Sequence, residues 1–146
     1  MNNTDVLIAL EAIRQLKARY LRFVDTKQWD GFQALFCDDA TMDISDDVPD
    51  LILTGSQVIR DAVSHSLAEC LSVHQGFMPE LDILSPTEAR GLWAMQDKLQ
   101  WTRDCGNGIR DLDGWGHYHE TYRKVGDEWR IQTLKLTRLR LDAVRW

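Results

Sequence analysis

The stretch GWGHYHETYRKVGDEWRIQTLKLTRLRL, residues 114–141, decides the fold class of this chain. It is rich in aromatic and branched residues and is interrupted only at Gly126 and Asp127, a pair that favours a tight hairpin turn. The pattern predicts two long antiparallel strands, 114–125 and 128–146, joined at that turn. Such a hairpin indicates a large sheet rather than a helical bundle.

Two further strands precede this hairpin. Residues 72–84 and 88–103 have the same aromatic and branched character, and Ser-Pro-Thr separates them. Every second residue from 91 to 101 shares one face, which is mostly apolar and therefore covered. The members of this face are Gly91, Trp93, Met95, Asp97, Leu99 and Trp101. Asp97 is a lone carboxylate among them, and it is either a second acid of a pocket with a raised pKa or an inward charge that protects the sheet.

The first half of the chain is helical in pattern. Apolar residues recur every three or four positions after Thr4, a possible N-cap, which predicts a helix over 5–25. A short helix over 29–36, a strand that opens at Ala40 and a third helix over 57–70 follow. The order predicts one α+β domain over 1–146, in which three helices cover one face of a bent, mostly antiparallel sheet and enclose a pocket.

Composition excludes several classes of partner. The formal net charge of −6 argues against nucleic acid and anionic membranes, which require clustered positive charge. Basic residues do gather late in the chain, where they alternate with leucines and indicate the outer edge of a strand: Lys135, Arg138, Arg140 and Arg145. No apolar stretch is long enough to span a bilayer, and no signal peptide is visible, so we expect a cytoplasmic protein.

Metal and disulfide sites are not predicted. The three cysteines are widely spaced and form no CxxC pair, which fits a reducing compartment. An acidic run between residues 38 and 50 lacks the spaced ligands of an EF-hand and favours a solvated loop.

Three segments, in order, resemble the SnoaL-like branch of the nuclear-transport-factor-2-like superfamily. They are DTKQWDGFQALFCDDATMD (25–43) after the first helix, SVHQGF (72–77) in a strand, and GHYHETYRKVGDEWRI (116–131) near the end. The resemblance covers nearly the whole chain. It implies a cone built from a bent sheet and three helices, with a pocket at the mouth, and a homodimer or homotrimer.

The resemblance also implies site residues. Scytalone dehydratases, the hexachlorocyclohexane dehydrochlorinase and the bile acid 7α-dehydratase use an aspartate at the end of the first helix to orient a histidine on a pocket strand, and these positions match Asp25 and His74. The bile acid enzyme also has a tyrosine that matches Tyr20. The chain departs from scytalone dehydratase at four other pocket positions, Val24, Ile44, Leu99 and Gly116. The dyad is therefore carried over, but the substrate is not.

The implied chemistry is proton abstraction from carbon. His74 would act as the base and Asp25 would orient it, because a carboxylate on one ring nitrogen fixes the tautomer and stabilises the cation. Tyr20 and Tyr118 are the hydroxyl candidates for holding an oxyanion or protonating a leaving group. Trp93, Leu99 and Asp97 are predicted to contact a small cyclic, aromatic or steroid-like molecule. The scheme predicts a dehydratase-like lyase or isomerase that requires no metal or cofactor.

Other readings stay open at this point. Asp25 is also a good N-cap for the second helix, with Gln28 completing a capping box. His117 and His119 alternate with Tyr118, so they point outward or into a subunit contact. The fold also serves non-catalytic roles, such as a ligand-binding module or the small subunit of ring-hydroxylating dioxygenases, and this is the alternative function.

Overall fold

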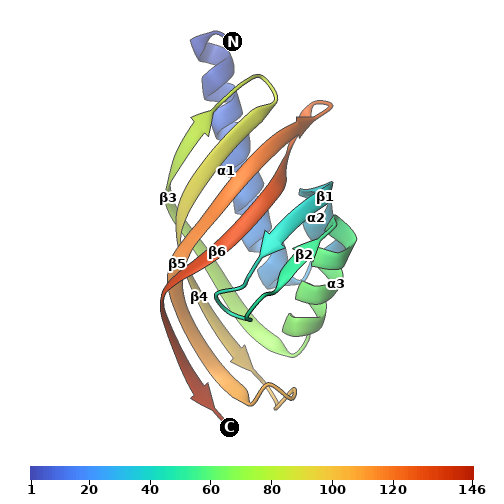
Figure 1. The fold of residues 1–146 in the computed structure, drawn as a ribbon, viewed down its shortest axis with the longest axis vertical. Helices are drawn as coiled ribbons and strands as arrows, with labels where there is room; N and C mark the ends of the chain where they lie inside the picture. The colour runs from blue at the N-terminus through green and yellow to red at the C-terminus, as the bar shows by residue number, and fades with distance from the viewer.

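The computed structural model describes residues 1–146 and contains three helices and six strands. The helices are α1 (Asn3–Thr26), α2 (Trp29–Ala34) and α3 (Ser56–Leu67). The strands are β1 (Phe36–Asp43), β2 (Ile52–Thr54), β3 (Cys70–Ile83), β4 (Glu88–Trp101), β5 (Ile109–Val125) and β6 (Glu128–Arg145). In Figure 1, β3 to β6 form a long, bent sheet with α1 on one of its faces, while β1, β2, α2 and α3 gather beside it.

All six strands belong to one sheet, in the order β2-β1-β6-β5-β4-β3. β1 runs parallel to β6, and the other neighbours are antiparallel. The predicted fold class, a curved, mostly antiparallel sheet with N-terminal helices, is therefore confirmed. The hairpin between β5 and β6 turns at Gly126 and Asp127 as predicted, because Val125 pairs with Glu128 across it.

Several predicted boundaries are wrong, and β2 is not predicted at all. β1 begins at Phe36 rather than Ala40, because Phe36 already pairs with Ile131 of β6. Leu35 and Phe36, the apolar pair before Cys37, continue the helical pattern of α2 in the sequence. The pattern therefore does not show where the helix ends and the strand begins. Cys70 starts β3 instead of ending α3, since it pairs with Trp101 of β4.

α1 is fixed at both ends. Asn2, and not the predicted Thr4, is the N-cap: its side chain accepts the backbone N–H of Asp5 at 2.8 Å, and the Asp5 carboxylate accepts the N–H of Asn2 at 3.1 Å. At the other end, Lys27 adopts a left-handed conformation with φ of 58°. Its ammonium donates to the carbonyl of Cys70 at 2.7 Å and to the carbonyl of Leu67. These bonds hold the end of α1 against the start of β3.

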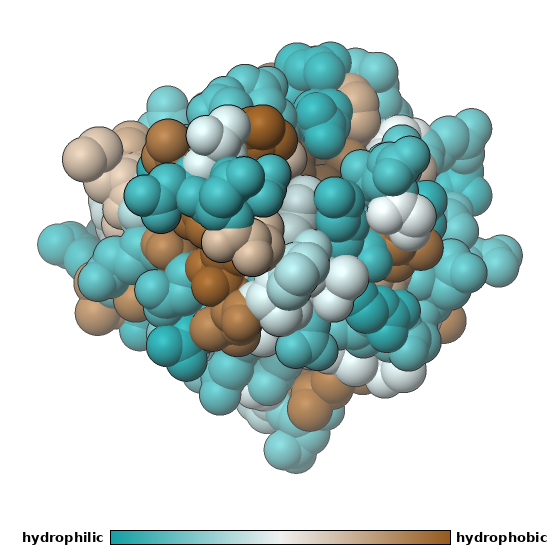
Figure 2. Space-filling model, turned by 90° about the horizontal axis from the view of Figure 1, so that it is seen from above, coloured by the Kyte–Doolittle hydropathy of each residue, from teal (hydrophilic) through white to brown (hydrophobic).

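A single cluster of 27 buried apolar residues joins the helices to the sheet. α1 contributes its buried stripe to this core: Ala9, Ile13, Leu16, Tyr20 and Val24. Seen from the end where α1 begins, apolar side chains gather in small groups separated by polar ones (Figure 2). No helix is both long and apolar enough to cross a membrane.

Candidate active site

Asp25 and His74 are in contact where α1 ends against β3. Nδ1 of His74 lies 2.7 Å from Oδ1 of Asp25, and the backbone N–H of His74 donates to Oδ2 at 2.8 Å. The hydroxyl of Ser72 donates to Oδ1 at 3.0 Å. A carboxylate only accepts hydrogen bonds, so this contact assigns the ring proton to Nδ1 and leaves Nε2 with a free lone pair.

The free nitrogen of His74 is accessible. The side chains of His74 and Asp25 are 12% and 21% exposed, respectively. Three fully enclosed side-chain atoms lack a hydrogen bond, namely Oδ1 of Asp111, Nε of Arg130 and Oε1 of Gln132. Nε2 of His74 makes no hydrogen bond within the protein, and the side chain is partly exposed, so water can reach it. That is the position required of a base.

Two phenols border the same interior. The rings of Tyr20 and Tyr118 have centroids 5.9 Å apart and an interplanar angle of 73°, and both residues are buried. Neither hydroxyl makes a hydrogen bond within the protein, and Tyr20 and Tyr118 are 6% and 2% exposed. Burial, together with nearby carboxylates, raises the pKa of each phenol above its ordinary value. Both therefore stay protonated and can donate a hydrogen bond to an oxygen of a ligand.

Asp97 belongs to an ion pair with Arg138. Nη1 of Arg138 donates to Oδ1 at 2.7 Å and Nη2 donates to Oδ2 at 3.0 Å. The two side chains are 4% and 8% exposed, respectively. The prediction of a separate pocket acid is thus wrong, because both oxygens of Asp97 accept hydrogen bonds from a cation. The prediction that Arg138 lies on an outer strand edge is wrong as well: its side chain turns inward and also reaches Asp47 at 2.7 Å.

Gly114 of β5 makes room for this ion pair. The register places Gly114 beside Asp97 of β4, and Arg138 of β6 lies beside Gly116, the next residue on this face. A Cβ atom on Gly114 would lie 2.2 Å from Nη1 of Arg138 and 2.4 Å from Oδ1 of Asp97. The guanidinium therefore crosses β5 over a position that only glycine leaves open.

A second buried ion pair lies under the phenols. Nζ of Lys17 is 2.8 Å from Oε2 of Glu120, and neither side chain is exposed. The interior beside the dyad is therefore more polar than the predicted apolar pocket. Trp93 donates its indole N–H to Tyr122 at 2.9 Å, while Leu99 is 9% exposed and borders the core. Both are buried on the inner face, as predicted.

Four polar residues of this interior lack a predicted role: Lys17, Ser72, Glu120 and Arg138. Lys17 does fall on the apolar stripe of α1, next to Leu16 and one turn before Tyr20, and this is the signal that identifies it. Glu120 shares the inner face with Tyr118, which is a similar signal. Neither position indicates its partner, because the two lie 103 residues apart.

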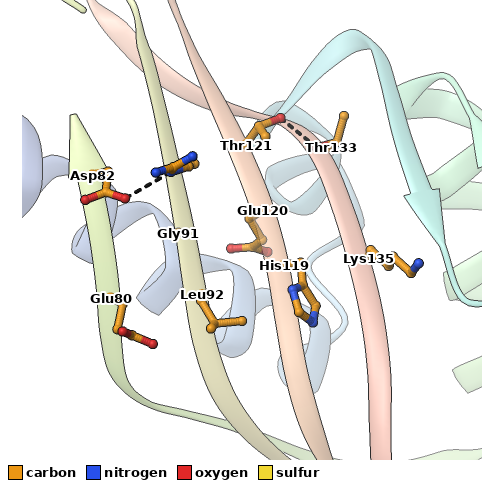
Figure 3. A pocket seen from close by; sticks show the side chains of 10 residues that line it. Glu80, Asp82, Gly91, Leu92, His119, Glu120, Thr121, Thr133 and Lys135 are labelled. Atoms are coloured by element: carbon orange, nitrogen blue, oxygen red, sulfur yellow. Dashed lines mark hydrogen bonds and ion pairs between the residues drawn. The ribbon is translucent and has the colours of Figure 1, made fainter. Parts of the chain in front are cut away.

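His117 and His119 lie on the outer face of the sheet, as predicted. His119 contacts the hydroxyl of Thr137 at 2.9 Å and lines an outer hollow of about 470 Å³. Figure 3 shows this hollow, with Glu80, His119 and Lys135 on its wall. Three other surface hollows, of 390 to 500 Å³, lie around α1 and α2. None of these four is lined by Asp25 or His74.

Comparisons with known proteins give the family. Residues 5–135 match the model of the SnoaL-like domain. The probable cyclase FGR4 of Gibberella zeae is 30% identical over 139 residues, which cover 90% of this chain and 91% of that protein. A candidate scytalone dehydratase from Novosphingobium aromaticivorans superposes with a TM-score of 0.87 at 18% identity, over 99% of this chain and 93% of the other. The hexachlorocyclohexane dehydrochlorinase LinA Type2 gives 0.84 at 18% identity, over 98% and 93%. The chain belongs to the SnoaL-like domain family, and its fold is the nuclear-transport-factor-2-like cone.

Proposed function

We propose that this protein is a cofactor-free lyase that removes a proton from carbon and eliminates water from a small cyclic molecule. The observation that carries the proposal is the contact between Nδ1 of His74 and Asp25 at 2.7 Å, with Nε2 free and accessible. A neutral imidazole can accept a proton from carbon through its free nitrogen, and the carboxylate on its other nitrogen stabilises the cation that forms. A purely structural subunit does not require this arrangement.

The reaction begins at a carbon next to a carbonyl group of the substrate. Nε2 of His74 takes the proton, and the electron pair of the broken C–H bond forms an enolate. The enolate oxygen accepts hydrogen bonds from Tyr20 and Tyr118, whose phenols remain protonated. Asp25 stabilises the imidazolium that has formed. A hydroxyl on the next carbon then leaves with the proton of the imidazolium as water, and a conjugated double bond remains.

Isomerisation uses the same first step. If the substrate already contains a carbon–carbon double bond next to the acidic carbon, proton removal gives a dienolate. The imidazolium can then return its proton to the far end of the dienolate, so that the double bond moves and no water is lost. A positioned base of this kind contributes roughly 10²- to 10⁴-fold in rate, so the two phenols and the binding of the substrate must supply the rest.

The buried groups around the dyad suggest the kind of substrate. Trp93 and Leu99 would contact its rings, while the phenols of Tyr20 and Tyr118 would donate to a polar substituent. A cyclic hydroxy-ketone, a phenolic polyketide or a steroid-like molecule meets these requirements. We further propose a homodimer or homotrimer, whose subunit number a sedimentation experiment would determine.

A cyclisation is a second candidate function, and the 30% identity to the probable cyclase FGR4 favours it. Here the enolate carbon attacks a second carbonyl of the same molecule, a carbon–carbon bond forms, and the new alkoxide takes the proton from the imidazolium. A linear diketone substrate would distinguish this reaction, because its product is a ring of unchanged mass.

Deuterium exchange tests the shared first step. A thermal-shift screen of hydroxy-ketones, phenols and steroids identifies a ligand, and NMR then follows exchange of its acidic C–H in D₂O. We expect His74→Ala and Asp25→Asn to slow the exchange by about 10²- to 10⁴-fold while binding persists. Wild-type protein that binds a ligand without exchanging any C–H would instead support the non-catalytic binding module.

A further inference from the structure

The Lys17–Glu120 pair calls for an explanation beyond stability. Both side chains are completely buried, with Nζ 2.8 Å from Oε2. Removing two charges from water costs several kcal/mol per ion, and an apolar pair of similar size is often as stable or more stable. A hydrophobic residue at position 17 would continue the apolar stripe of α1. The stability of the fold alone therefore does not explain well why a charged residue occupies position 17.

The ammonium of Lys17 lies against both phenols. It is 3.7 Å from the ring centroid of Tyr20 and 3.5 Å from that of Tyr118. A cation over an aromatic face draws electron density from the ring. In a phenol this withdrawal polarises the O–H bond, so each hydroxyl becomes a stronger hydrogen-bond donor. These are the two hydroxyls without a protein partner.

Glu120 holds the ammonium in place. Its second oxygen, Oε1, accepts the hydroxyl of Tyr122 at 2.7 Å, and the Tyr122 oxygen accepts the indole N–H of Trp93 at 2.9 Å. The carboxylate is thus fixed from β4 and β5, and it fixes Lys17 in turn. Its negative charge acts on the phenols in the opposite sense to that of Lys17, because it disfavours negative charge at their oxygens or at a ligand oxygen bound to them.

We propose that Lys17 is a positioning residue for the proposed reaction: it orders Tyr20 and Tyr118 and strengthens both as donors to the oxyanion. Lys17 does not touch the substrate, because it is fully enclosed and acts through the two rings. The inference rests on the proposed function for the identity of the oxyanion. The electrostatic effect on a bound anion, however, requires no turnover.

The test compares an aromatic anion with the neutral molecule that lacks its charged oxygen. Calorimetry measures the dissociation constants of 4-nitrophenolate, at a pH where it is ionised, and of nitrobenzene. We expect the preference for the anion to fall about tenfold in Lys17→Met and to rise by a similar factor in Glu120→Gln. A merely structural pair predicts the same direction for both variants, since either change breaks the same contact.

Two controls locate the effect. Lys135→Met removes a positive charge from the outer face and should leave the preference unchanged. Tyr20→Phe should reduce the preference, because the anion then loses a donor. If Lys17→Met does not fold, Glu120→Gln tests the inference alone, since glutamine can still accept the hydroxyl of Tyr122. A damaged structure would not be expected to bind the anion more strongly, so the expected rise in preference cannot result from misfolding.

Three results would overturn the inference: no preference for the anion in the wild type, no change in either variant, or changes of the same sign in both. Each of them is separate from failure of the proposed function, which appears as absent C–H exchange. The His74→Ala protein should bind the anion and still respond to the charge at position 17.

Discussion

Two acid–base pairs join α1 to the sheet, and they differ in access to solvent. Lys17 and Glu120 are completely enclosed, whereas Asp25 and His74, which meet about two turns further along the same helix, are 21% and 12% exposed. Proton transfer between a side chain and a substrate requires contact between them. Of the two pairs, only the partly exposed pair, Asp25 and His74, could therefore take part in it. The enclosed pair can only supply a fixed field. Under the proposed function, burial would separate the group that reacts from the group that tunes its surroundings.

The largest expected effect concerns the enclosed pair. Lys17→Met should lower the free energy of unfolding by about 3–5 kcal/mol, because Glu120 would remain as a buried charge without its partner. His74→Ala should cost much less, since water and Ser72 can still reach Asp25. Denaturant unfolding measures both, with Lys135→Met as a control that should change stability by less than about 0.5 kcal/mol. Equal losses in Lys17→Met and His74→Ala would contradict the comparison.

Alkaline pH should act almost as strongly. All three tyrosines have a pKa raised mainly by burial, so the folded state keeps protons that the unfolded state releases above about pH 10. Their contribution to stability is complete below that pH and is lost as the pH rises. By about pH 11 the loss is roughly 1.4 kcal/mol per tyrosine, or about 4 kcal/mol in total. Phenolate absorbance should appear only together with unfolding. Its appearance in the folded protein would show that burial does not keep the phenols protonated.

Two glycines of β5 allow a comparison between a Cβ that would meet backbone atoms and a Cβ that would meet side-chain atoms. A Cβ on Gly116 would lie 1.8 Å from the carbonyl oxygen of Thr137, which belongs to the backbone, whereas a Cβ on Gly114 meets the ends of Arg138 and Asp97. Gly116→Ala should therefore cost about 2–4 kcal/mol of stability, and Gly114→Ala about 1–2 kcal/mol. Thermal unfolding measures which substitution costs more stability. A larger loss in Gly114→Ala would mean that disturbing the Asp97–Arg138 pair costs more than the clash with the backbone.

The smallest expected effect is at Ser72. Ser72→Ala removes the hydroxyl that donates to Asp25 at 3.0 Å and should cost about 1 kcal/mol, because the carboxylate keeps its two bonds from His74. The rate of C–H exchange should fall severalfold without a change in ligand affinity. Ser66→Ala, at the exposed end of α3, provides a control. A loss as large as that of Asp25→Asn would mean that Ser72, and not the aspartate, orients the imidazole.

The sequence was sufficient for the overall architecture. The periodicity of α1 and the long alternating strands predict the layers, because one face of each element must be buried. The closeness of Asp25 and His74 came from the family resemblance and not from periodicity, since no local pattern relates residues 49 positions apart.

The buried ion pairs could not be predicted from the sequence for a different reason. Arg138 alternates with leucines as an outer-edge residue would, but a register shift between Trp115 and Gly116 in the pairing of β5 with β6 changes which side chains share a face. The bulge leaves Leu139 of β6 without a partner in β5, so Arg138 continues the inward face of Leu134 and Leu136 while Leu139 points outward. Likewise β2 is a strand of three residues, Ile52–Thr54, too short for any alternation to be visible.

α1 carries Lys17, Tyr20 and Asp25 on one straight helix, and this has a consequence for how the site can change. Because the helix rises about 1.5 Å per residue, the backbone positions of the three residues are at fixed distances along its axis, about 12 Å from Lys17 to Asp25. Their separation is preserved whenever the sheet is remodelled around them. Replacing residues of β4 and β5 would therefore change the shape of the interior without changing the spacing of these three groups along α1.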